Sequence, residues 1–168
     1  MEYPQITIVD DKDNLIGYQD YPKAIEEGMI RRVSSVYVFD TDGRLLLQKR
    51  SEHVRYPLLF DASSSGHVDK GETYLQAAER ELYEELSLSD IPLKEIVLSY
   101  RTSECFVGIY KATIAAKTPI IFNAHEIESI EWKTPKEVDM LITQEPQLFI
   151  DVFVQQWIDL RATLTSHI

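Results

Sequence analysis

The stretch Gly66–Leu88, GHVDKGETYLQAAERELYEELSL, decides both the fold and the chemistry expected of this chain. It contains Glu72 and then Arg80, Glu81, Glu84 and Glu85. On a helix, positions 81, 84 and 85 lie on one face, where like charges oppose helix formation. A divalent cation removes that repulsion, and Mg²⁺ is commonly shared between a few carboxylates and a substrate's phosphates. The alternative is a solvated acidic helix face without a ligand.

This segment resembles the Nudix box, whose pattern is G, five residues, E, seven residues, then R-E-U-x-E-E-x-G-U, with U an aliphatic residue. Gly66 is followed by five residues and Glu72, and seven more lead to the run Arg80-Glu81-Leu82. The pattern then continues through Glu85 and Leu86. Ser87 stands where the pattern has glycine, and it is the one fixed position that departs.

The resemblance implies an α/β (α+β) fold, a Nudix-type α/β/α sandwich with a central mixed β-sheet and a loop–helix–loop catalytic motif. We expect one domain over residues 1–168, with the box at 66–88. Hydrophobic and turn patterns predict strands at 5–9, 15–18, 31–39, 44–50, 94–100, 105–115 and 127–132. They predict helices near 21–27, 73–87, 135–141 and 147–160.

Local signals sharpen this outline. Asp40 to Gly43 reads as the turn of a β-hairpin between strands 31–39 and 44–50. Thr73 and Gln76 have capping-box spacing. Leu75, Ala78, Leu82 and Leu86 share one helix face and are expected to pack on the sheet, with the acidic stripe directed away from the core. Because Ser87 is poorly suited to the left-handed conformation that glycine favours there, we expect a slightly different turn after the helix.

The resemblance also implies roles for the motif residues. Nudix hydrolases use metal-assisted attack of water on a phosphoanhydride, so Glu81, Arg80 and Glu85 are the expected catalytic residues. Glu81, Glu84, Glu85, Glu72 and the Gly66 carbonyl are the expected metal ligands, for Mg²⁺ or Mn²⁺, with Glu72 either supporting the loop or reaching the metal through water. The general base is Glu81, a neighbouring motif glutamate, or a carboxylate of a later loop, for which Glu126 and Glu128 are the candidates.

Charged residues close to the motif are candidates for substrate contact. Arg50, Arg55 and Lys70 have the charge to meet phosphates, although each such residue is more often a solvated surface charge. His67 is open to three interpretations: a hydrogen-bond donor to phosphate, a structural loop residue, or the relic of a metal site. With Glu126, these residues form the expected substrate-binding set.

The flanking sequence resembles the branch of the family related to isopentenyl-diphosphate isomerase. That isomerase has a cysteine directly before the Gly-His pair, where this chain has Ser65. It also has a metal-binding histidine where this chain reads Arg31-Arg32, and an acid near the position of Ser103 or Glu104. Since a hydroxyl is a far weaker acid than a thiol, isomerase activity is the less favoured alternative. A catalytically silent nucleotide-binding module is a third.

Composition limits the classes of partner and the cellular location expected for this chain. The net charge of −11 argues against a nucleic-acid polymer or an anionic membrane, but not against a small phosphorylated substrate held by a metal and local basic residues. A polar, acidic N-terminus and a single cysteine favour a cytoplasmic location. The apolar helix predicted at 147–160 is compatible with a homodimer. The expected function is metal-dependent hydrolysis of a diphosphate linkage in a nucleoside-diphosphate-X-type small molecule.

Overall fold

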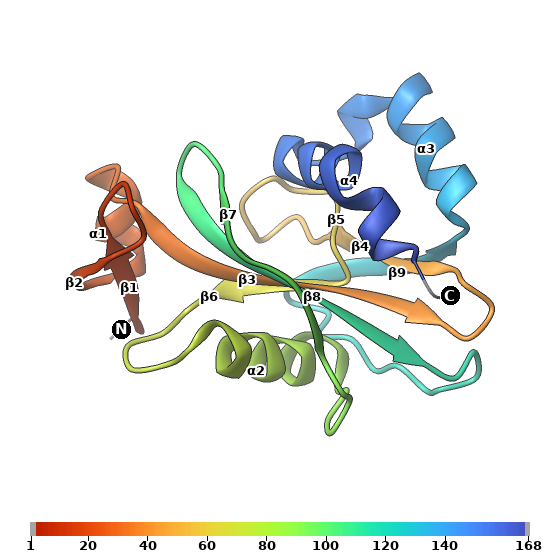
Figure 1. Ribbon diagram of the computed structural model, residues 1–168, viewed down its shortest axis with the longest axis horizontal. Coiled ribbons are helices and arrows are strands. Elements are labelled where there is room, and N and C mark those ends of the chain that lie inside the picture. Colours follow the sequence, from red (N-terminus) through yellow and green to blue (C-terminus); the bar gives the residue numbers. More distant parts are fainter. Residues whose placement is uncertain (1–2, 167–168) are drawn as a thin grey trace.

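The fold is built around a nine-stranded sheet in which parallel and antiparallel pairs are mixed. It is seen in a computed structural model that describes residues 3–166 (Figure 1). The strands are β1 (Gln5–Val9), β2 (Leu15–Asp20), β3 (Arg31–Asp40), β4 (Leu45–Arg50), β5 (Phe60–Asp61), β6 (Ser64–His67), β7 (Lys94–Arg101), β8 (Cys105–Ile114) and β9 (Ile127–Lys133). The helices are α1 (Tyr21–Glu26), α2 (Tyr74–Leu86), α3 (Pro135–Gln144) and α4 (Asp151–Leu164), with a 3₁₀ turn at Pro146–Leu148.

Strand β3 organises the sheet. It pairs in parallel with β8 along its whole length and antiparallel with β6 from Val33 to Val36. Successive side chains of a strand point to opposite faces, so even-numbered residues such as Val36 face α2, and odd-numbered ones such as Tyr37 face α4. Residues that pair with β3 follow the same division, which places Ser65 and His67 of β6 on the α4 face.

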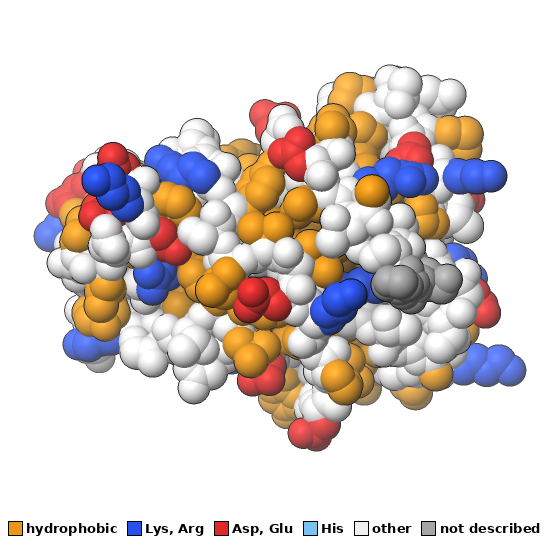
Figure 2. Space-filling model, in the orientation of Figure 1, with side chains coloured by type: hydrophobic (Ala, Val, Ile, Leu, Met, Phe, Trp, Pro, Cys, Tyr) orange, Lys and Arg blue, Asp and Glu red, His pale blue; other side chains and the backbone are white. Residues whose placement is uncertain are grey.

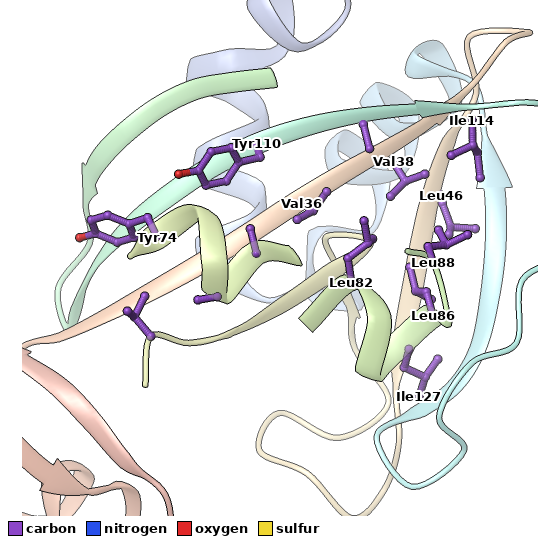
Figure 3. Packing of buried hydrophobic residues seen from close by; sticks show 14 of the residues in the cluster. Val36, Val38, Leu46, Tyr74, Leu82, Leu86, Leu88, Tyr110, Ile114 and Ile127 are labelled. Carbon is purple, nitrogen blue, oxygen red and sulfur yellow. The ribbon is translucent and has the colours of Figure 1, made fainter. Parts of the chain in front are cut away.

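Helices cover both faces of the sheet, which confirms the expected α/β/α sandwich (Figure 1). On one face, Leu82 and Leu86 of α2 pack with Val36 and Tyr110 (Figure 3). On the other, Phe153 of α4 stacks between other aromatic rings: Tyr37, Phe149 and Trp157. On the face shown in Figure 2, acidic, basic and apolar side chains are interspersed, and neither charge gathers into a large patch. None of the helices among residues 3–166 is long and apolar enough to cross a membrane.

The predicted 31–50 hairpin is only partly correct. The turn forms as expected, with Gly43 at a φ of 80° and the Asp40 carboxylate accepting from the backbone N–H groups of Asp42 and Arg44. However, the two strands pair only at Phe39 and Leu45 and then diverge. Strand β3 uses its edges for β8 and β6 instead.

Helix α2 confirms the capping box, since Thr73 and Gln76 bond to each other's backbone N–H groups. Two other expectations are wrong. Leu75 is 42% exposed, and Tyr74 and Ala77 take its place in the core. Ser87 keeps the left-handed conformation, with φ 54° and ψ 32°. Its N–H bonds the Tyr83 carbonyl, and that of Leu88 bonds the Leu82 carbonyl, so the helix ends as a glycine would end it.

The C-terminal helix also differs from its prediction. We expected one helix over 147–160, whereas a 3₁₀ turn at Pro146–Leu148 precedes α4, which begins at Asp151. Between them, Phe149 and Ile150 have extended backbone, and the Ile150 N–H bonds the Phe60 carbonyl of β5. This tertiary hydrogen bond interrupts a hydrophobic pattern that local spacing alone reads as continuous.

Candidate active site

The motif helix lies directly against β6 at Gly66. A Cβ atom added to Gly66 would stand 1.9 Å from Glu81 Oε1 and 2.0 Å from Glu81 Cδ. Neither contact is possible for a real side chain, so only glycine allows the carboxylate to reach the strand backbone. The same approach places the Gly66 backbone beside the motif glutamates, where the sequence resemblance expected it.

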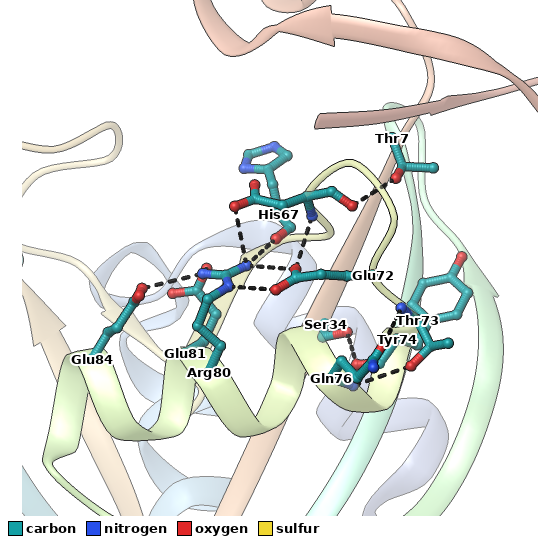
Figure 4. A network of polar contacts seen from close by, with 11 residues as sticks. Thr7, Ser34, His67, Glu72, Thr73, Tyr74, Gln76, Arg80, Glu81 and Glu84 are labelled. Atoms are coloured by element: carbon teal, nitrogen blue, oxygen red, sulfur yellow. Dashed lines mark hydrogen bonds and ion pairs between the residues drawn. The ribbon is translucent and has the colours of Figure 1, made fainter. Parts of the chain in front are cut away.

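Arg80 joins the loop before α2 to the helix itself (Figure 4). Its Nε donates to Glu72 Oε1 at 2.8 Å, and its Nη2 donates to the His67 carbonyl at 2.9 Å. Its Nη1 donates to Glu81 Oε1 at 2.7 Å and to Glu84 Oε2 at 3.1 Å. One guanidinium thus orients three motif carboxylates through charge-assisted hydrogen bonds, and Glu72 in turn accepts from the backbone N–H of Asp69.

Glu85 is buried, in contrast to the expected outward direction of the acidic stripe. It is 3% exposed and accepts hydrogen bonds from the Ser65 N–H at 3.1 Å and from Gln48 Nε2 at 3.4 Å. The offset of one position from Glu84, about 100° around the helix, turns its side chain under β6. Glu84, by comparison, is half exposed.

Burial makes two of these carboxyl groups, Glu81 and Glu85, costly to ionise. Burial raises the pKa of Glu81 to about 7, against the lowering effect of Arg80 and with a further increase from Glu84 and Glu126. Burial, followed by the charge of Glu81, also raises the pKa of Glu85 well above its usual range. A cluster that is this costly to ionise is what a bound cation would neutralise.

The donor set fits a hard divalent cation in chemistry, since it consists of carboxylate oxygens, to which the resemblance adds the Gly66 carbonyl. Within residues 3–166, however, no three His, Cys, Asp or Glu side chains converge as a ready-made metal cage. The reason is visible in the contacts: Arg80 engages Glu81 and Glu84, while Ser65 and Gln48 engage Glu85. The guanidinium supplies part of the positive charge that these carboxylates require.

A cleft of about 1040 Å³ brings together most of the residues singled out in the sequence. It is lined by Arg50, Arg55, Gly66, His67, Arg80, Glu81, Glu84, Glu85 and Glu126, and by others from β3, β8 and α4. Two expected residues are not in the lining. Glu72 lies behind it as a partner of Arg80, and Lys70 points elsewhere, to Gln5 and the ring of Tyr18. Lys70 is therefore not brought to the cleft as a substrate contact.

Four arginines line this cleft, and sequence reasoning missed one of them. Arg50 donates to the buried Asp61 at 2.9 Å, and Arg55 pairs with Glu104. Arg31, considered only as the replacement of a histidine, is 3% exposed and also pairs with Glu104 at 2.7 Å. The signal that would have found it is its odd-numbered position on β3, which shares a face with Ser35 and Ser65.

His67 lies in this cationic environment. Its ring centroid is 4.8 Å from that of Tyr21. Burial, together with Arg31, Arg55, Arg50 and Arg80, lowers the pKa of His67 to about 3. The imidazole is therefore neutral at physiological pH, and it can meet a phosphate only as a neutral hydrogen-bond donor.

Comparison with known proteins places this geometry in context. The model of the NUDIX domain family matches residues 29–152. Isopentenyl-diphosphate Delta-isomerase 2 of Photorhabdus laumondii is 31% identical over 157 residues, covering 86% of this chain and 85% of the relative. An uncharacterized Nudix hydrolase of Nostoc sp. is 31% identical over 149 residues, covering 84% and 87%. The crystal structure of DR0079 from Deinococcus radiodurans superimposes with a TM-score of 0.73 at 26% identity, covering 84% of this chain and 90% of that one.

Proposed function

This chain belongs to the Nudix family as a Nudix hydrolase, and from that premise we propose that it uses Mg²⁺ or Mn²⁺ to cleave a diphosphate linkage in a small molecule of the nucleoside-diphosphate-X type. Nudix hydrolases generally need a divalent ion, and the family acts on small substrates. The observation that carries the proposal is the carboxylate cluster of α2 at the edge of the cleft. Glu85 is buried there and Glu81 is partly buried, and burial raises the pKa of both carboxyl groups.

We assign the metal to Glu81, Glu84, Glu85 and the Gly66 carbonyl, with Glu72 acting through Arg80. When bound, a divalent ion there neutralises phosphate charge and lowers the pKa of coordinated water. Glu81, whose carboxylate reaches the cleft beside Gly66, accepts a proton from the attacking water. Glu126 is the alternative base, because it lines the cleft, whereas Glu128 does not line it.

The substrate side of the proposal rests on the basic lining. Arg50 and Arg55 have guanidinium groups suited to phosphate oxygens, and His67 offers a neutral ring. These groups, rather than the overall charge of −11, determine the local field met by an anionic ligand. The identity of the group linked to the diphosphate is set by lining residues outside the motif.

Isomerase activity is the second candidate, favoured by the 31% identity to an isopentenyl-diphosphate isomerase. Two contacts speak against it. Ser65 Oγ, at the position of the isomerase cysteine, lies 3.0 Å from Ser35 Oγ, and this hydroxyl pair contains no readily released proton. The isomerase has a metal-binding histidine where this chain reads Arg31-Arg32, and the Arg31 guanidinium is ion-paired to Glu104.

The test is a ³¹P NMR screen with Mg²⁺ of nucleoside triphosphates, nucleotide sugars, dinucleotides, NADH and isopentenyl diphosphate. Glu81→Gln and Glu85→Gln remove proposed catalytic carboxylates, and Glu79→Gln is the matched control on the exposed side of α2. We expect new phosphate resonances from a nucleotide with the wild-type and control proteins only. Equal turnover by Glu81→Gln would contradict the assignment. Conversion of isopentenyl diphosphate alone would favour the isomerase, and metal binding without any turnover would favour a silent module.

A further inference from the structure

A second charged cluster lies in the lining of the cleft, away from α2. It combines Arg31 at the start of β3, Arg55 in the loop between β4 and β5, and Glu104 in the turn between β7 and β8. These three segments are distant in the sequence. Their charged side chains meet only because β3 pairs with β8 and because the 51–59 loop lies over the same cleft.

One carboxylate serves two guanidinium groups in this cluster. Arg55 grips Glu104 with both terminal nitrogens, Nη1 to Oε2 at 3.0 Å and Nη2 to Oε1 at 3.1 Å. Arg31 Nη2 donates to the same Oε2 at 2.7 Å. Two guanidinium groups share one carboxylate, so the cluster carries a net positive charge. A further anion could therefore be paired there.

Arg31 is the member with the strongest need for an anion. Its side chain is 3% exposed, one Nη donates to the Met29 carbonyl, and the Nε atom is buried without a hydrogen-bond partner. A buried guanidinium is costly unless it is fully paired. Glu104, in contrast, is 46% exposed, and Arg55 is 37% exposed, so both can exchange partners with a ligand that enters from solvent.

We propose that Arg31 and Arg55 form an oxyanion-binding site of the cleft, which Glu104 occupies until a phosphate group takes its place. The bidentate grip of Arg55 on a carboxylate is the same geometry that a guanidinium offers to phosphate. As a statement about the substrate, this inference rests on the proposed function. It then requires that the substrate carry a phosphate oxygen that reaches Arg31 and Arg55 as well as the motif glutamates. Glu104 is the internal competitor for that position.

The experiment measures anion binding without catalysis. Sodium pyrophosphate is titrated by calorimetry into the wild-type protein, Glu104→Gln and Arg55→Met, in buffer freed of divalent cations and at fixed ionic strength. Without a cation the motif glutamates repel pyrophosphate, so binding reports on the arginines. The matched controls are Glu95→Gln and Lys117→Met, which change exposed charges outside the cleft. Thermal denaturation verifies that each variant is folded.

We expect Glu104→Gln to bind pyrophosphate about fivefold more tightly and Arg55→Met about fivefold more weakly, as befits partly exposed charge pairs. Both controls should match the wild type. The proposal is overturned if Glu104→Gln binds no more tightly, if Arg55→Met binds equally well, or if no protein binds pyrophosphate. Intact pyrophosphate binding together with an unreactive Mg²⁺ screen would instead count against the proposed hydrolase alone.

Discussion

At the scale of single residues, the site depends on positions where one atom more or less matters. Gly66 is the clearest case, because the Glu81 carboxylate occupies the space that a Cβ would need. Ser87 is the opposite case, a side chain kept in a conformation that suits glycine. His67 is a third, since burial and then four neighbouring arginines lower its pKa.

Gly66→Ala should displace Glu81 from β6. We expect destabilisation of about 2 kcal/mol, because overpacking forces the carboxylate or the strand to move. Any hydrolysis found in the Mg²⁺ screen should fall with it. Urea denaturation and activity measure the two effects. Gly17→Ala is the matched control, since an added Cβ at Gly17 meets nothing within 4 Å, and a similar loss in that variant would refute the steric explanation.

Ser87→Gly should stabilise the protein by about 1 kcal/mol, the cost of the left-handed conformation for a residue with a Cβ. The melting temperature should rise while the cap hydrogen bonds remain. Ser89→Gly provides the comparison, since Ser89 does not have a positive φ and gains only backbone freedom in the unfolded state. If both variants behave alike, the helix end is not strained at Ser87.

The neutral state of His67 makes stability depend on pH. Its pKa in the folded protein is about 3, whereas the unfolded chain binds a proton near the ordinary value of about 6.5. Stability supported by the neutral ring is present above that value and declines as the pH falls below it. His67→Gln should therefore lose less unfolding free energy than the wild type between about pH 7.5 and about pH 5. His53→Gln, at an exposed histidine, should follow the wild type.

At the scale of elements, α2 shows what sequence can and cannot predict. Its start is encoded locally in Thr73 and Gln76, so it was predictable. The inward position of Glu85 was not, because it depends on the Ser65 N–H of a strand that makes only four pairs with β3. The prediction that Leu75 packs on the sheet was wrong for the same reason. Several residues fit one helical face, and the neighbouring sheet determines which of them are buried.

Thr73→Ala should cost about 1 kcal/mol, because the N–H of Gln76 loses its acceptor. Chemical denaturation is the measurement, and a normal midpoint would show that the cap is dispensable. The comparison is Thr163→Ala, at an exposed position of α4, where alanine's helix propensity should keep the change within about 0.5 kcal/mol.

At the scale of the whole molecule, the cleft uses both faces of the sheet. The carboxylates come from α2 on one face, while Arg31, Ser65 and His67 lie on the face covered by α4. The Nudix resemblance predicted the sandwich and the motif helix. It could not predict that Arg31 joins the lining, because the pairing of β3 with β8 brings together residues more than seventy positions apart.

Glu85 should lower the stability of the cation-free protein and allow a divalent cation to raise it. Without divalent ions, Glu85→Gln removes a buried carboxylate that Glu81 repels, and its melting temperature should exceed that of the wild type. Added Mg²⁺ should raise the melting temperature of the wild type and have little effect on the variant. Glu79→Gln should respond to Mg²⁺ as the wild type does. A wild type that Mg²⁺ leaves unchanged would contradict the metal assignment.

Arg80 divides its hydrogen bonds between two tasks. Nε and Nη2 hold Glu72 and the His67 carbonyl, which fix the loop to the helix, and Nη1 holds Glu81 and Glu84. A cation that neutralises Glu81 and Glu84 competes with Nη1 alone for their carboxylate oxygens. The contacts of Arg80 with Glu72 and the His67 carbonyl therefore remain when a cation replaces Nη1 at Glu81 and Glu84. The position of the loop on the helix does not depend on whether a cation is bound.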